Sequence, residues 1–201
     1  KKHTFFYIRD LFSFLIVCAN LFILSVVLNA QEKSFVPSVA HVQTTYHSEL
    51  FYSMKESATI IYDETTQAFL VKIDFGKLKT GVDSLDEWLL DLEESQLVYK
   101  AALSPEAFPT PGNLVSKNIK LPGTISFNKQ SHNVDLNLLI FEVNEQGIMY
   151  REYGNNQYDK FRFRFSINIA PKDYKIDKKP HHLKKTISVM ISNGVINLIK
   201  H

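Results

Sequence analysis

The chain has 201 residues, a formal net charge of +2 and 45% hydrophobic residues. A domain of about 150 residues buries roughly 68–70% of its unfolded surface, so one domain without disulfides is the expectation. The single cysteine, Cys18, lies within the first thirty residues. The rest of the chain can therefore contain neither a disulfide nor a cysteine nucleophile.

The first thirty residues have the layout of a secretory signal peptide. Three basic residues precede a nearly unbroken apolar run over 11–28, which ends in small residues at Ala30. We expect residues 1–30 to be cleaved, leaving a periplasmic or secreted domain, 31–201, with no stable membrane span. The alternative is an uncleaved membrane anchor, because the run is about long enough to cross a bilayer.

Without this leader the charge is balanced but unevenly distributed. The leader holds three of the 23 Lys+Arg and one of the 21 Asp+Glu, so 31–201 carries 20 of each. Residues 160–201 have a net charge of +8, which leaves −8 on 31–159. A basic segment can mark an anionic partner, but Arg162 and Arg164 alternate with phenylalanines, as on the solvated face of a sheet. No nucleic-acid recognition motif is present, and we expect no nucleic-acid partner.

From residue 58 onward, short alternating segments are separated by turn residues, which is typical of antiparallel sheets. Pro122-Gly123 suggests an edge or a bulge, and Asn193-Gly194 between two apolar runs predicts a hairpin turn. Seven or more strands at this spacing indicate a sandwich or a barrel. The predicted strands are 58–62, 68–75, 97–103, 118–127, 133–143, 148–152, 161–169, 186–191 and 195–199.

The clearest strand is 161–169, where apolar and polar residues alternate strictly. Successive side chains of a strand point to opposite faces, so this pattern predicts one face in a core and the other in water. Three consecutive inward phenylalanines predict a wide apolar interior. The apolar face carries Phe161, Phe163, Phe165, Ile167 and Ile169, and the polar face carries Arg162, Arg164, Ser166 and Asn168.

One segment breaks the β pattern and predicts a short α-helix. Residues 84–87, Ser-Leu-Asp-Glu, have the form of a capping box with Ser84 as the N-cap. We expect the helix to run to about Glu94 and to cover one end of the barrel. Its apolar stripe, at helical spacing, consists of Leu85, Trp88, Leu89 and Leu92.

Several of these segments resemble the YceI-like domain family of extracytoplasmic, polyisoprenoid-binding, lipocalin-like β-barrels. Residues 71–88 resemble the strand, turn and helix of that family, and 121–139 resemble its hairpin. Residues 165–176 and 186–191 resemble its late and closing strands. The resemblance implies an all-β, antiparallel barrel of about eight strands with one short α-helix.

The residues that could carry chemistry do not form a catalytic or metal-binding motif. His181-His182 is the best metal candidate, but neighbouring lysines favour a solvated loop. His41, His47 and His132 are the alternative if they converge in space. We expect no catalytic residue, no metal and no cofactor, although an enzyme assembled from dispersed polar groups stays an alternative.

The inward aromatic residues allow two interpretations, because small barrels are either filled by side chains or hold one small ligand. The resemblance favours a cavity and implies non-catalytic binding of an apolar or amphipathic, isoprenoid-type lipid. The alternative is a structural or protein-interaction barrel with a packed core and no ligand. The oligomeric state is not predicted. The candidate lining residues are Phe69, Val71, Ile73, Phe75, Leu89, Ile125, Leu136, Leu138, Phe161, Phe163, Phe165 and Ile167.

Overall fold

The computed structural model of the chain describes residues 35–46, 49–79, 81–92, 94–112, 115–143, 158, 160–176 and 186–199. The chain divides into two compact units, Lys1–Phe35 and Val36–His201, and the elements below belong to the second. The expected leader, the strand at 148–152, His47 and His181-His182 lie outside the described residues. Within the described ranges, no helix has both the length and the apolar character needed to span a membrane.

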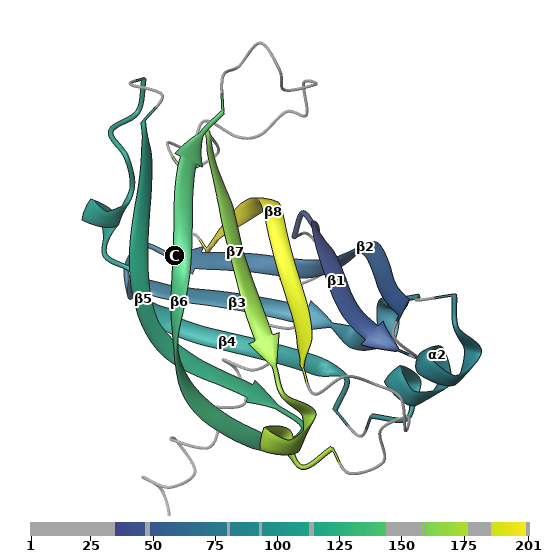
Figure 1. The fold of residues 1–201 in the computed structure, drawn as a ribbon. Helices are drawn as coiled ribbons and strands as arrows, with labels where there is room; N and C mark the ends of the chain where they lie inside the picture. Colours follow the sequence, from purple (N-terminus) through teal and green to yellow (C-terminus); the bar gives the residue numbers. More distant parts are fainter. Residues whose placement is uncertain are drawn as a thin grey trace, which may run out of the picture. The chain divides into compact units, whose positions relative to one another are not determined.

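The second unit is a closed barrel of eight strands in which each strand pairs antiparallel with the next (Figure 1). One α-helix, α2 (Asp83–Leu90), and the short 3-10 helices η1 (Phe75–Lys77), η2 (Pro105–Ala107) and η4 (Pro171–Tyr174) are described in the connections. The prediction of an all-β antiparallel barrel of about eight strands with a short helix is confirmed. The strands are β1 (Ser38–Tyr46), β2 (Glu49–Asp63), β3 (Ala68–Asp74), β4 (Gln96–Ala102), β5 (Ser116–Phe127), β6 (Gln130–Glu142), β7 (Phe161–Ile169) and β8 (Ile187–Ile199).

Strand β7 has the alternation that its sequence predicts, with one exception. Its five apolar side chains are buried, and Arg164, Ser166 and Asn168 are exposed. Arg162, expected in solvent, is buried instead. Its guanidinium folds back on the chain, and Nη1 donates to the carbonyl oxygen of Phe161 at 2.9 Å. The prediction of a fully solvated outer face is therefore wrong at this position.

The predicted hairpin at Asn193-Gly194 is wrong, because β8 runs through it as one strand. The β7–β8 register shifts there: Phe163 pairs with Gly194, whereas Phe165 pairs with Ile191. A Cβ on Gly194 would lie 2.4 Å from Cδ1 of Ile60, on β2. This glycine permits close packing between strands rather than a turn.

The sequence pattern missed β1 and the first part of β2. Strand β1 has few apolar residues, and among its side chains that the structure describes, at 38–43, only Ala40 and Val42 belong to the hydrophobic core. Its Thr- and Gln-containing sequence does not alternate clearly between apolar and polar residues. Pairing with β2 and β8 holds it in the sheet.

Strand β8 closes the barrel with two partners. Its first half pairs antiparallel with β1, and its second half pairs parallel with β2. Two side chains add hydrogen bonds at this junction. Ser38 Oγ accepts from the backbone N–H of Val195 at 2.8 Å. Asn197 Oδ1 accepts from the N–H of Val36 at 2.6 Å, while its Nδ2 donates to the carbonyls of Ile60 and Val36 at 2.9 and 3.0 Å.

Helix α2 lies at the end of the barrel where β3 finishes and β4 begins (Figure 1). The predicted capping box is wrong, because the N-cap residue is Val82 and makes no side-chain capping bond. Ser84 is therefore the second helical residue, and the helix ends at Leu90 rather than near Glu94. Of the predicted stripe, Trp88 and Leu89 are buried in the core and Leu92 packs against it. The side chain of Leu85 lies outside the described residues.

Replacing Asn197 by leucine should lower the free energy of unfolding by roughly 1–3 kcal/mol, because the buried carbonyl of Ile60 and the half-buried backbone groups of Val36 lose their partners. Urea unfolding of the parent and the variant measures this difference. Asn168→Leu, at an exposed position of β7, is the matched control and should change stability by no more than about 0.5 kcal/mol. An equal loss of unfolding free energy in both variants would show that the hydrogen bonds of Asn197 do not stabilise the junction of β8 with β1 and β2.

Candidate functional site

All twelve residues predicted to line a cavity belong to the buried core of the barrel. Their exposed fractions run from 0% for Val71 to 5% for Leu89. A side chain facing an empty chamber wide enough for water would keep more exposed area than this. Protein atoms therefore fill the space in front of these residues, and their role as the lining of a ligand site stays a prediction.

Aromatic rings form a continuous cluster near the end of the barrel opposite α2. Phe69 packs against Phe163 with ring centroids 5.6 Å apart, and against Tyr99 at 6.5 Å. Phe108 lies 5.5 Å from Phe161 and 6.1 Å from Phe163. These separations are those of favourable aromatic pairs, worth about 0.5–1.5 kcal/mol each beyond the buried area.

A second aromatic cluster lies at the α2 end. Phe127 packs against Phe75 at 5.1 Å and against Tyr174 at 5.7 Å. The His132 ring meets Tyr174 edge-on at 5.0 Å, and its Nε2 lies 2.7 Å from the carbonyl oxygen of Asp173. Burial raises the pKa of Tyr174, and the nearby Asp173 adds to the effect.

Two tyrosine hydroxyls, on strands β2 and β4, are buried, and both already have hydrogen-bond partners. Tyr62 donates to the carbonyl oxygen of Leu103 at 3.1 Å, and Tyr99 donates to that of Leu121 at 2.7 Å. Burial raises the pKa of Tyr62 to about 12, with smaller contributions from Glu64 and Asp63. Burial also raises the pKa of Tyr99 to about 12, and Asp135 contributes less. Both hydroxyls therefore stay neutral at physiological pH.

Gly123 makes room for Tyr99. A Cβ at this glycine would lie 2.6 Å from the Tyr99 hydroxyl and 2.5 Å from the carbonyl oxygen of Lys100. Gly123 is also the first residue of β5 to pair with β4, so Pro122 lies just before that pairing begins. The edge that the sequence suggested at Pro122-Gly123 is therefore present.

The histidines of the described residues do not converge. His41 Nε2 lies 3.2 Å from Ser192 Oγ, on β8, whereas His132 contacts the η4 segment through Asp173. Among the residues that the structure describes, no group of three or more His, Cys, Asp or Glu side chains is placed to hold a metal ion.

An open depression of about 490 Å³ lies on the β5–β6 hairpin. Its polar side chains bond to their neighbours: Thr124 donates to Asn133 at 3.1 Å, and Asp135 pairs with Lys120 at 2.7 Å. These groups are engaged with one another rather than directed at a ligand. The depression is lined by Pro122, Gly123, Thr124, Asn133, Val134 and Asp135.

Three aromatic residues near the first cluster were missed by sequence reasoning as site candidates. Tyr99 alternates with Leu97 in a predicted strand, so its inward direction could have been found from the period of two. Tyr62 ends a predicted strand and offered the same signal. Phe108 lies in the irregular segment Pro-Glu-Ala-Phe-Pro and carries no periodic signal.

No protein-family model matches the sequence, and no curated protein matches it. Among solved structures, the chain is similar to a polyisoprenoid-binding domain from Saccharophagus degradans implicated in plant cell wall breakdown. The identity is 12% and the TM-score 0.55, over 76% of this chain and 90% of that chain.

Two further solved structures are less similar. BcnA of Burkholderia cenocepacia has 11% identity and a TM-score of 0.48, over 76% of this chain and 92% of that one. The YceI protein of Campylobacter jejuni has 15% identity and a TM-score of 0.40, over 68% and 80%. At such identities only the fold is established, and it rests on the first structure. The chain has the YceI-like barrel fold that its sequence segments resemble.

Proposed function

We propose that this protein binds an apolar or amphipathic chain molecule of the isoprenoid-lipid type inside its barrel, without catalysing a reaction on it. The observation that carries the proposal is the inner face of β7, where five consecutive inward side chains are apolar and buried. The fold shared with a polyisoprenoid-binding domain supports the proposal.

The inward side chains of the strands suit a hydrocarbon ligand. Strand β3 directs Phe69, Val71 and Ile73 inward, and all three are buried. Because Tyr62 and Tyr99 already donate to backbone carbonyls, these two hydroxyls do not require a polar ligand. Each methylene transferred from water to such a wall contributes about 0.8 kcal/mol. Affinity would therefore grow with the length of the chain that enters.

A bound chain has to replace side chains that now fill the interior. Strand residues are held by the ladder of hydrogen bonds on both sides, so their positions are costly to change. Phe108 is different, because it follows η2 in the connection between β4 and β5. Its side chain can therefore move without breaking a strand ladder.

A second candidate function is favoured by the near-zero exposure of the inward side chains. In that case the core is simply filled, and the barrel acts as a structural or interaction module through its outer surface. The two candidates differ in one measurable property, which is whether apolar molecules enter the protein.

We also propose that the protein acts outside the cytoplasm, after removal of residues 1–30. The support is the charged start, apolar run and small-residue end of this segment in the sequence. N-terminal sequencing of the protein purified from its host should find Gln31 first. An intact Lys1 on a membrane-bound form would contradict cleavage.

Replacing Ile167 by phenylalanine should weaken uptake of a fluorescent isoprenoid analogue, because the added ring occupies interior volume. Ser166→Phe adds the same ring to the outer face of β7 and should leave uptake unchanged. Fluorescence titration measures both variants, and native mass spectrometry of the parent from its host should show a co-purified lipid.

The packed-core alternative makes the opposite forecast for these experiments. The parent would then bind no analogue and carry no lipid. Ile167→Phe would destabilise the barrel by about 1–3 kcal/mol through overpacking. That combination would replace lipid binding by the interaction-module function.

The barrel should lose stability as the pH rises from about 10 towards 12, because unfolded tyrosines ionise near pH 10 while burial keeps Tyr62 and Tyr99 protonated up to about pH 12. The raised folded-state pKa contributes stability that is complete below the unfolded value and disappears above the folded one. Urea unfolding across this pH range, followed by circular dichroism, should show a smaller fall for the Tyr62→Phe, Tyr99→Phe double variant. The two proteins differ only in these two hydroxyls, so equal falls would contradict the assignment.

A further inference from the structure

A connecting segment, rather than a strand, supplies the aromatic side chain that closes one end of the interior. Phe108 is 7% exposed. Its ring lies 4.7 Å from Tyr158 and 5.2 Å from Tyr62, in addition to its contacts with Phe161 and Phe163 on β7. We call residues 104–112, which carry Phe108, the strap.

The strap cannot become part of the sheet. Pro105, Pro109 and Pro111 have no backbone N–H to offer to a ladder. Gly112 has φ of +89°, a conformation that favours glycine. The strap is therefore a separate piece of chain between the buried Leu103, whose N–H donates to the carbonyl of Gln67 at 2.8 Å, and the start of β5.

The strap lies against a half of β5 that has no β4 partner (Figure 1). Strand β4 pairs with residues 123–126 of β5 only, whereas β6 pairs with β5 along its whole length. Beside residues 116–122 of β5, the strap occupies the position that a longer β4 would fill. If it moved away, the barrel wall would open between β4 and β5.

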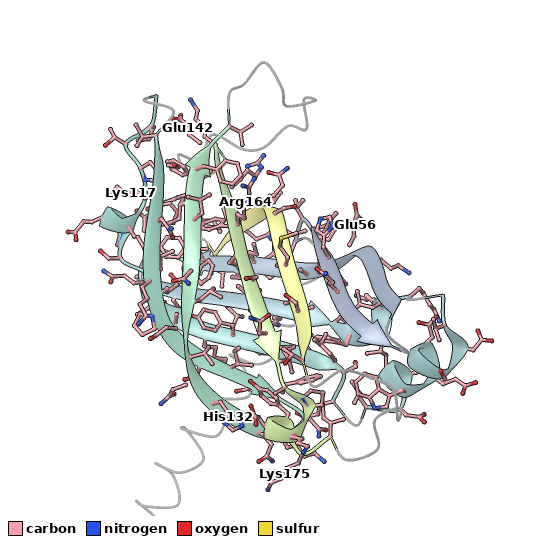
Figure 2. The ribbon with its side chains drawn as sticks, in the orientation of Figure 1. Glu56, Lys117, His132, Glu142, Arg164 and Lys175 are labelled. Carbon is pink, nitrogen blue, oxygen red and sulfur yellow. The ribbon has the colours of Figure 1, made fainter. Side chains whose placement is uncertain are left out.

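Two side chains at this end of the barrel hold the strap in place. Lys117 Nζ donates to the carbonyls of Glu106 and Phe108 at 2.7 and 2.9 Å. The carboxylate of Glu142 accepts from the N–H of Gly112 at 2.8 and 2.9 Å. Figure 2 shows Lys117 and Glu142 at the same end of the barrel, with His132 at the other. These contacts can break while the strand ladders stay intact.

We propose that the strap is a movable plug, that the apolar ligand enters the barrel between β4 and β5 when the strap swings out, and that Lys117 and Glu142 latch it shut. This inference rests on the proposed function, because an entrance has meaning only for a protein that takes up a ligand. Swinging the strap out also withdraws the Phe108 ring from the aromatic cluster. Opening the entrance and making room for the ligand are then one movement.

The first test needs no ligand and compares hydrogen exchange of the parent and of Lys117→Met. The variant keeps the aliphatic stem but loses the donor to two carbonyls. Strap amides, including those of Ala107 and Phe108, should exchange about tenfold faster, in line with the loss of a charge-assisted hydrogen bond. Lys120→Met is the matched control on the same strand, because Lys120 pairs with Asp135 instead. Equal strap exchange in the parent and Lys117→Met would overturn the latch.

The second test measures entry and exit of a fluorescent prenyl probe by stopped-flow. In Lys117→Met, the association rate constant should rise and Kd should fall, each by up to about tenfold. The reason is that the Lys117 contacts hold the Phe108 ring in the space that the probe takes, so they oppose entry and do not retain a probe that is already inside. A variant whose strap exchanges faster but whose probe rates equal those of the parent would place the entrance elsewhere. A parent that takes up no probe would instead overturn the proposed function itself, and the entrance with it.

Discussion

The interior of this protein exists only because β8 joins the two ends of the sheet. The last strand cannot pair with β1 along its full length, since β1 begins at Ser38, so its second half turns to β2. The change of partner leaves backbone groups that no strand satisfies, and Ser38 and Asn197 supply the missing hydrogen bonds. Gly194 lets Ile60 pack at the same junction. With the two ends joined, the sheet leaves few free edges for another chain to pair with.

The interior of a closed barrel cannot be densely packed and also hold a ligand in the same space. Dense aromatic packing stabilises a small domain, but the same packing leaves no space for a second molecule. In the proposed function, these two roles belong to different parts of the chain. Phe161, Phe163 and Phe165 belong to a strand that is hydrogen-bonded on both sides, whereas Phe108 approaches them from a connection. The part that we propose to move is thus a connecting segment outside the strand ladders.

Sequence reasoning succeeded where one face of a strand is buried and the other is wet. The alternation of β3 and β7 placed their apolar side chains inside, and the total pattern indicated the barrel. It failed at Asn193-Gly194, because a glycine required by a neighbouring side chain looks the same as one required by a turn. It also failed at Ser84, where the helix begins without a side-chain cap. Phe108 could not be found, because its position follows from the tertiary path of an irregular segment.

The arrangement of β8 also has a consequence for how the barrel folds. The bond between Val36 and Asn197 joins residues 161 positions apart in the chain. Contacts of such long range form slowly, because a large loop must be ordered before they stabilise anything. Strands β2 to β7 can assemble from neighbouring pairs, but their aromatic face stays open to water until β8 docks. The docking of this strand therefore separates productive folding from aggregation.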